Sequence, residues 1–374
     1  MQGVPGEGGT AADRALEGFR HPGFPKGGGG TFCIQRAQRR RVNRAALQAA
    51  LPLALLMLAG CSGDRSILDP AGPAARDVAW LWWAMLSGFG LVFVAVVVAW
   101  LAAFRPRAHV ERSPAEERRF SLRWILGGGI VLPGVSILAL LVFGVPTGQR
   151  MLPVTLPGET PPQVIEVVGH QWWWEIRYPG EQGDVVTANH LVMPAGEPVE
   201  FHVTSADVIH AFWVPRLGGK IDMLPGRTNR IRLEADEPGV FGAQCAEFCG
   251  VQHTHMHLHV EALPREEYEV WLDARRSPLP EDEAHAQARQ DFIQHCAGCH
   301  RVAGLSDGER GPDLSDIGSR ATLGAGVMAM EEGAIARWLA THQSLKPGNR
   351  MPSHDDLEDE TLERLGAWLE NLTP

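Results

Sequence analysis

The residues whose types and spacing could do chemistry are concentrated between Cys245 and Met256. Cys249 lies four positions after Cys245, His253 follows after four more, and Met256 after a further three. Sulfur ligands combined with imidazole favour copper over hard cations. Two thiolates can bridge two copper ions, and each ion then needs one imidazole of its own. His253 can supply one, and we expect His210, on an upstream strand, to supply the other.

Simpler uses of these residues leave part of the pattern unexplained. A four-ligand zinc site or a disulfide does not account for the methionine. A mononuclear blue-copper site uses one cysteine, two histidines and a weak axial ligand, so the second cysteine would have no role. The pattern therefore favours a dinuclear copper centre.

A second chemical motif, Cys296-Ala-Gly-Cys299-His300, lies near the C-terminal end. Cys-x-x-Cys-His attaches haem c through two thioether bonds, and its histidine becomes an axial ligand of the iron. A redox-active Cys-x-x-Cys pair would share part of this pattern. The surroundings favour haem, because residues 287–295 have helical spacing and Gly311-Pro312 is similar to the proline segment beside the haem histidine of class I cytochromes c.

The second axial ligand of the haem iron is expected from a methionine. Met351, in Asn349-Arg-Met351-Pro352, is our preferred candidate. Met328 and Met330 are alternatives, but their alanine- and glycine-rich surroundings lack a following proline. An amphipathic helix over residues 360–372 is expected to close this C-terminal domain.

Residues 164–263 resemble the copper domain of the cytochrome c oxidase subunit II family, which carries a dinuclear CuA centre. The resemblance rests on four segments: Gly169-His170-Gln171-Trp172, the segment around His210, Gly218–Arg227 and the Cys245–Met256 loop. It implies that the two cysteines bridge the coppers and that His210 and His253 are terminal ligands. It also implies axial ligation of one copper by Met256 and of the other by the carbonyl of Glu247.

The same resemblance implies roles outside the copper ligands. Trp172 would be the surface aromatic through which electrons enter from cytochrome c, whereas Trp173 and Trp174 are expected in the core. The Glu247 carboxylate would reach a magnesium ion at the interface with subunit I. Asp207 would be an acid at an interface, although a plain exposed carboxylate is an equal alternative.

The C-terminal part resembles the cytochrome c domain that is fused to subunit II in caa-type oxidases, and the two resemblances together cover residues 79–374. They imply an electron-transfer subunit of a proton-translocating cytochrome c oxidase, with no catalytic residue of its own. Electrons would pass from haem c to CuA and on to haem a of subunit I. The implied partners are subunit I with haem a and haem a3–CuB, subunit III, cytochrome c or an upstream respiratory complex, and the membrane.

Two other functions remain open at this stage. One is the electron-accepting subunit of a nitric oxide reductase, and the other is a membrane-tethered electron carrier or copper-delivery lipoprotein. The two apolar helices, the Glu247 carboxylate and Gln171-Trp172 argue against a free carrier. A quinol-oxidase subunit II is excluded by the complete set of copper ligands.

Charge is distributed unevenly along the 374 residues. The net charge is −10, but residues 1–60 carry eight basic and three acidic side chains, which leaves about −15 for the rest. Such an acidic remainder excludes generic nucleic-acid binding and suits a basic partner.

The N-terminal region has the pattern of an exported lipoprotein. Residues 1–30 are rich in glycine and are expected to be disordered, or to precede the true start. A basic segment, residues 36–44, and an apolar run, residues 45–59, lead to Leu58-Ala-Gly-Cys61. This order is typical of a signal peptide, and its end resembles the bacterial lipobox, in which Cys61 would be lipidated. A plain signal peptide or a short buried helix is the alternative.

Two uncharged stretches, residues 79–104 and 124–147, are long enough to cross a bilayer as helices. The intervening residues 105–123 hold six arginines and three glutamates. The positive-inside rule therefore places this loop in the cytoplasm and both flanks outside, at a bacterial inner membrane. Ser121 stands where the family often has a glutamate at a proton channel, so no residue is assigned that role.

Short apolar runs separated by turns follow from residue 164, and they predict an antiparallel β-sandwich, as cupredoxins have. His255, His257 and His259 alternate with apolar residues, which favours an outward histidine face over additional metal ligands. The fold class is thus a multidomain membrane protein with a two-helix transmembrane hairpin, an all-β cupredoxin sandwich and an all-α class I cytochrome c domain. The expected boundaries are leader 1–60, linker 61–78, hairpin 79–147, linker 148–163, CuA domain 164–270, linker 271–284 and cytochrome c domain 285–374.

Overall fold

The computed structural model describes residues 63–105, 112–155, 157–158, 160–181, 183–277 and 283–373. The expectations for the leader and for lipidation of Cys61 lie outside these residues and stay predictions.

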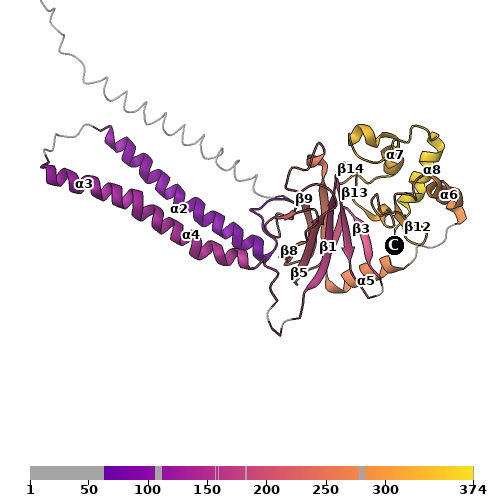
Figure 1. The fold of residues 1–374 in the computed structure, drawn as a ribbon, viewed down its shortest axis with the longest axis horizontal. Helices are drawn as coiled ribbons and strands as arrows, with labels where there is room; N and C mark the ends of the chain where they lie inside the picture. Colours follow the sequence, from indigo (N-terminus) through magenta and orange to yellow (C-terminus); the bar gives the residue numbers. More distant parts are fainter. Residues whose placement is uncertain are drawn as a thin grey trace, which may run out of the picture. The chain divides into compact units, whose positions relative to one another are not determined.

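Two helical segments are long and apolar enough to span a membrane. The first is α2 (Pro73–Ala103), and the second is formed by α3 (Pro114–Leu126), a π-helical stretch (Gly127–Val131) and α4 (Leu132–Gln149). Figure 1 shows α2 beside α4, and the rings of Trp80 and Phe143 meet with their centroids 6.0 Å apart. The expected pair of apolar helices is therefore confirmed.

The second helix begins ten residues before the predicted position 124, because its start is capped. The Ser113 hydroxyl accepts the backbone N–H of Glu116, and the Glu116 carboxylate accepts the backbone N–H of Ser113. This reciprocal capping satisfies N–H groups that have no partner inside the helix, so a charged segment can extend an apolar one.

The β-sandwich consists of two five-stranded sheets. One has the order β3-β2-β1-β5-β8, and the other has the order β4-β10-β9-β6-β7. Their strands are β1 (Gln163–His170), β2 (Trp173–Tyr178), β3 (Val185–Ala188), β4 (His190–Pro194), β5 (Val199–Ser205), β6 (His210–Trp213), β7 (Ile221–Met223), β8 (Asn229–Leu233), β9 (Gly239–Cys245) and β10 (His257–Leu263).

The expectation of a purely antiparallel sandwich is wrong for two strand pairs. β1 pairs with β5, and β4 pairs with β10, in parallel. The chain crosses from one sheet to the other between β3 and β4 and returns at β5, so strands that no hairpin joins become neighbours. The predicted alternation itself is present: along β10 the histidines are partly exposed, and Leu258 and Val260 are buried.

A helix that the sequence did not predict, α5 (Arg265–Arg276), packs against the sandwich. Its Tyr268 and Leu272 are buried in the same hydrophobic core as the strands. The expected linker from residue 271 therefore begins only after Arg276, because an apolar helical face covers the edge of the core.

The C-terminal domain is helical, as predicted, with a core of its own. Its main helices are α6 (Ala286–His295), α7 (Ala334–Leu345) and α8 (Asp359–Glu370). Two small antiparallel pairs join them, β11 (Arg301–Val302) with β12 (Ser306–Asp307) and β13 (Thr322–Leu323) with β14 (Met328–Ala329). Single 3-10 turns lie at Glu283–His285 and Ile317–Ser319. A third one, His253–His255, belongs to the copper domain.

Candidate metal centre

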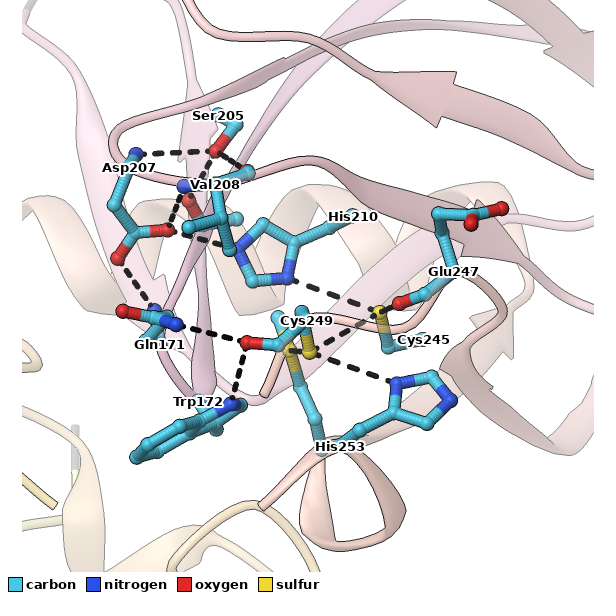
Figure 2. Close-up of polar contacts among 12 residues, drawn as sticks. Gln171, Trp172, Ser205, Asp207, Val208, His210, Cys245, Glu247, Cys249 and His253 are labelled. Atoms are coloured by element: carbon cyan, nitrogen blue, oxygen red, sulfur yellow. Dashed lines mark hydrogen bonds and ion pairs between the residues drawn. The ribbon is translucent and has the colours of Figure 1, made fainter. Parts of the chain in front are cut away.

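The copper-type ligands meet because two neighbouring strands carry them. His210 begins β6 and Cys245 ends β9, and these strands pair with Phe212 opposite Cys245. The loop after Cys245 then folds back, so that the Cys245 backbone N–H donates to the carbonyl of Met256 at 3.0 Å. Figure 2 shows the sulfur and imidazole groups of this loop converging on one point.

The distances form a chain from one imidazole to the other. His210 Nδ1 lies 3.8 Å from Cys245 Sγ, the two Sγ atoms lie 3.8 Å apart, and Cys249 Sγ lies 3.5 Å from His253 Nδ1. Met256 Sδ is 3.9 Å from Cys249 Sγ.

These distances separate the candidate uses of the two cysteines. A disulfide needs sulfurs about 2.05 Å apart, so this pair is reduced. A first-row metal binds thiolate at about 2.3 Å, so two sulfurs 3.8 Å apart can both contact the same ion. Because each imidazole lies beside a different sulfur, the described residues fit two metal ions bridged by two thiolates.

One of the two thiols loses its proton easily and the other does not. A hydrogen bond from Cys249, followed by one from His210, lowers the pKa of Cys245 to about 3 against the opposing effect of burial. The neighbouring Cys245 sulfur and burial raise the pKa of Cys249. Metal binding must therefore displace the proton of Cys249, which makes the metal affinity dependent on pH.

A second layer of contacts orients the ligands. Asp207 Oδ1 lies 2.9 Å from His210 Nε2, which leaves Nδ1 turned toward Cys245. Burial alone would raise the pKa of Asp207, but hydrogen bonds from His210 and from the backbone N–H groups of Gln171 and Val208 hold it below its ordinary value. A carboxylate behind a metal-binding imidazole fixes its tautomer and ring orientation. The sequence had suggested only an interface acid at this position.

Glu247 presents two different groups to its surroundings. Its carbonyl oxygen lies 3.2 Å from Cys245 Sγ, beside the bridging sulfurs, where an axial ligand would be needed. Its carboxylate points away and lies 3.6 Å from Lys220 Nζ. The magnesium role of that carboxylate stays a prediction.

Two of the three consecutive tryptophans differ from expectation. Trp172, predicted on the surface, is only 7% exposed, because residues of the C-terminal domain cover it. Its indole Nε1 donates to the carbonyl of Cys249 at 3.0 Å. Trp173, predicted in the core, is partly exposed and stacks on His170 with ring centroids 4.1 Å apart. Trp174 is buried, as predicted.

The Cys-x-x-Cys-His motif forms a helical turn directly after α6. The Nδ1–H group of His300 donates to the carbonyl of Pro312 at 2.8 Å, which leaves the Nε2 atom with a free lone pair. Burial lowers the pKa of His300, so the ring is neutral. A Cβ atom on Gly311 would come within 2.6 Å of the His300 ring, so only glycine allows this close approach. The motif therefore fits a covalently held haem with His300 as axial ligand.

The three candidate methionines all pack against the helical core, so packing does not choose among them. The backbone around Met351 is tightly held: its N–H donates to Asn349 Oδ1 at 3.0 Å, and its carbonyl accepts from His342 at 3.3 Å and from Gln343. The ligand role of Met351 stays a prediction.

Comparisons with known proteins agree with this arrangement. A family model described as cytochrome c oxidase subunit II, periplasmic domain, matches residues 179–263, and a cytochrome c model matches residues 286–373. Cytochrome c oxidase subunit 2 of Alkalihalophilus pseudofirmus is 34% identical over 346 residues, which is 86% of this chain and 96% of that relative.

Other relatives match a smaller part of the chain. Cytochrome c oxidase subunit 2 of Bacillus sp. strain PS3 is 33% identical, over 56% of this chain and 62% of the relative. Quinol oxidase subunit 2 of Bacillus cereus is 31% identical, over 63% and 81%. The periplasmic domain of subunit II from Bradyrhizobium japonicum is a similar solved structure, with 32% identity, a TM-score of 0.29 and coverage of 30% of this chain and 93% of that one.

The alignment with the first of these relatives extends over nearly its whole length and includes both the copper and the cytochrome c regions. The chain therefore belongs to the cytochrome c oxidase subunit II family, as a membrane-anchored member with a cytochrome c domain fused at its C-terminal end.

Proposed function

We propose that the chain receives electrons at its C-terminal domain and passes them through its copper domain to haem a of subunit I, where oxygen reduction is coupled to proton translocation. Haem c and a dinuclear copper centre supply one-electron redox chemistry when bound. The observation that carries the proposal is the direct contact between the C-terminal domain and the copper loop.

Lys346, at the end of α7, makes the central contact. Its Nζ atom lies within hydrogen-bond distance of three carbonyl oxygens, those of Trp172 at 2.7 Å, His255 at 2.8 Å and Gly324 at 2.6 Å. Two of these carbonyls belong to the copper domain, and the third belongs to the C-terminal domain. Lys346 is only 4% exposed, so water does not compete for its donors.

Neighbouring contacts extend this interface on both sides of the copper loop. Gln252 Nε2 donates to the carbonyl of Pro347 at 2.7 Å, and Arg350 donates to Gln171 Oε1 at 2.9 Å. Gln171 and Trp172 both donate to the carbonyl of Cys249. A short hydrogen-bonded route therefore leads from the C-terminal domain to a bridging cysteine.

A covalent tether assists this docking without strong charge attraction. Residues 285–374 carry 14 acidic and eight basic side chains, so the C-terminal domain is net acidic, like the domain it meets. The tether replaces a bimolecular encounter with an intramolecular one, at an effective concentration on the order of millimolar for a short flexible linker.

The clustered thiols and imidazoles favour cytochrome c, rather than quinol, as the source of electrons.

The order of electron transfer is tested with Cys245→Ser in the purified oxidase complex. The variant removes a bridging ligand, so haem c should still be reduced by an added donor but should not be reoxidised by oxygen. Stopped-flow absorbance of haem c measures both steps, and the parent should show reoxidation that depends little on ionic strength. Reoxidation at the parental rate in the variant would mean that electrons bypass the copper centre.

The identity of the partner needs a separate measurement. An absorption spectrum of the purified complex should show haem a together with haem c and the near-infrared band of CuA. Haem b in place of haem a, with nitric oxide reduction, would instead support the nitric oxide reductase.

We also infer that the outward Glu247 carboxylate reaches a divalent cation at the subunit I interface. The outward position of this carboxylate, whose side chain is 46% exposed, supports this inference. In a complex purified from cells grown with manganese, Glu247→Gln should weaken the electron paramagnetic resonance signal of bound Mn²⁺ without loss of copper. An unchanged signal would assign the cation to other residues.

A further inference from the structure

A second cluster of metal-binding side chains lies at the edge of the copper domain. The parallel pairing of β4 with β10 sets His190 directly opposite His259, and Glu261 lies two residues further along β10, on the same face. One ligand atom from each of the three side chains lies within 4.8 Å of the other two. Sequence alternation had assigned His259 to an outward histidine face, and nothing in the sequence pointed to His190.

We propose that His190, His259 and Glu261 form a second metal site, which takes zinc or another borderline divalent cation. Two imidazoles and one carboxylate are a ligand set of zinc, with a fourth position left for water. Hard cations such as calcium prefer all-oxygen sites. Because the copper centre uses other residues on other strands, the two sites can be filled independently.

The spacing of the ligand atoms is compatible with a metal ion. Zinc holds nitrogen and oxygen ligands at about 2.0–2.2 Å, so two ligands of a tetrahedral site lie roughly 3.3 Å apart. His190 Nε2 and Glu261 Oε2 are 3.3 Å apart.

The buried ring of His190 is incompletely paired. Its Nδ1 atom is buried and has no hydrogen-bond partner among the described residues. Its Nε2 atom faces Glu261, so Nε2 is the His190 atom that would bind the ion.

Other histidine–glutamate pairs in the chain provide an internal comparison. His202 lies 2.9 Å from Glu200, and His170 lies 3.2 Å from Glu175. Among the described residues, only the copper-type cluster and the His190 cluster bring three such ligand atoms together. The His202 pair therefore serves as a matched control, because it shares the chemistry but lacks the third ligand.

The position of the cluster suggests what a bound cation would do. It would join β4 to β10, and β4 is an edge strand of its sheet. Trp271 of α5 packs against His190 with ring centroids 6.3 Å apart. A metal here would therefore fasten the edge of the sandwich to which α5 is attached, and would raise the thermal stability of the copper domain.

Zinc content and zinc-edge X-ray absorption test the site in the intact oxidase complex. After equilibration with Zn²⁺ and removal of free metal, the parent should hold one more zinc per haem c than Glu261→Gln and His259→Gln do. The difference spectrum should show nitrogen and oxygen neighbours without sulfur. The control His202→Gln should bind as the parent does, and zinc should raise the thermal midpoint of the parent and the control alone.

Three outcomes would overturn the proposal: equal zinc in the parent and both cluster variants, sulfur neighbours that place the zinc in the copper centre, or zinc loss in the His202 control as large as in the cluster variants. Unchanged copper and haem c absorption in each variant shows that the chain has folded. Because these measurements do not depend on electron transfer, their outcome is separate from that of the Cys245→Ser test.

Discussion

The two imidazoles beside the bridging cysteines are held differently. His210 is fully buried, and Asp207 fixes its orientation. His253 is partly exposed and contacts the exposed ring of Phe248, with centroids 5.8 Å apart. One side of the centre is therefore internal, and the other side faces outward.

The methionine of this centre is expected to tune the metal more than to hold it. Met256 is fully buried, with its sulfur 3.9 Å from Cys249 Sγ. Met256→Leu conserves volume and should cost less than about 1.5 kcal/mol of stability. A weak axial ligand mainly sets the potential, so the variant should keep both coppers and turn over more slowly.

Metal analysis and near-infrared absorption measure that outcome. Cys249→Ser is the contrasting variant, because it removes a bridge and should abolish the dinuclear spectrum. Loss of both coppers from Met256→Leu would contradict the assignment of a weak axial role.

At the level of single residues, the sequence identified the ligands but not the residues that position them. Cysteine, histidine and methionine side chains reveal their chemistry by type and spacing. Asp207 and Lys346 do not, because an exposed acid and an ordinary surface lysine have the same sequence signature. Their roles depend on which backbone groups approach them, and only the folded chain specifies that.

Among the elements, the crossing of α7 and α8 shows how closely the helical domain is packed. A Cβ atom on Gly366 of α8 would lie 2.7 Å from the backbone nitrogen of Ala336 and 2.8 Å from its Cβ. Glycine therefore sets the distance between the two helices. Any larger side chain must push them apart.

Gly366→Ala should destabilise the C-terminal domain. Alanine is favoured over glycine in a helix by roughly 1 kcal/mol, but overpacking typically costs about 1–3 kcal/mol, so we expect a net loss of up to about 2 kcal/mol. Denaturant unfolding followed by haem c absorption measures the change. Glu363→Ala, on the exposed face of the same helix, should stay within about 0.5 kcal/mol of the parent, and an equal loss in both variants would contradict the packing argument.

Element types were largely predictable, whereas their pairing was not. Alternating apolar residues indicated strands such as β10, and uncharged length indicated the two spanning helices. The parallel pairs and α5 were missed, because local periodicity carries no information about which strands become neighbours. The early start of α3 was readable in principle, since Ser113 and Glu116 have capping-box spacing.

For the molecule as a whole, the family relationship implies a CuA centre, a haem c and association with other oxidase subunits. Within the chain, the C-terminal domain is held at two places. One is the Lys346 contact, and the other is Asp316, which accepts from Thr187 at 3.0 Å and pairs with Arg275 of α5 at 3.2 Å. The sequence indicated a tethered pair of redox domains, but the charges of two acidic domains do not favour this interface.

Docking of the C-terminal domain should strengthen as the pH rises above neutrality. Burial lowers the pKa of Lys346 to about 7 in the docked chain, whereas a solvated lysine titrates near about 10.4. The docked state thus binds fewer protons between these values, and its stability rises with pH by up to about 1.4 kcal/mol per unit. Below about pH 7 both states are protonated, and the dependence disappears.

Hydrogen exchange of the amides near Lys346, corrected for intrinsic rates and compared between pH 7 and 9, measures this dependence. Lys346→Met retains an apolar chain of similar length and should lose the pH slope. A slope of parental size in that variant would show that another group is responsible.

Cys245 and Cys249 expose only 5% and 3% of their surface in the docked chain, and Trp172 and Gln252, which flank them, are both held by the C-terminal domain. A metal ion that enters this site must reach both sulfurs. We therefore expect metal insertion to precede docking of the C-terminal domain. Copper supplied after docking should enter the site only as fast as the C-terminal domain dissociates from the copper loop.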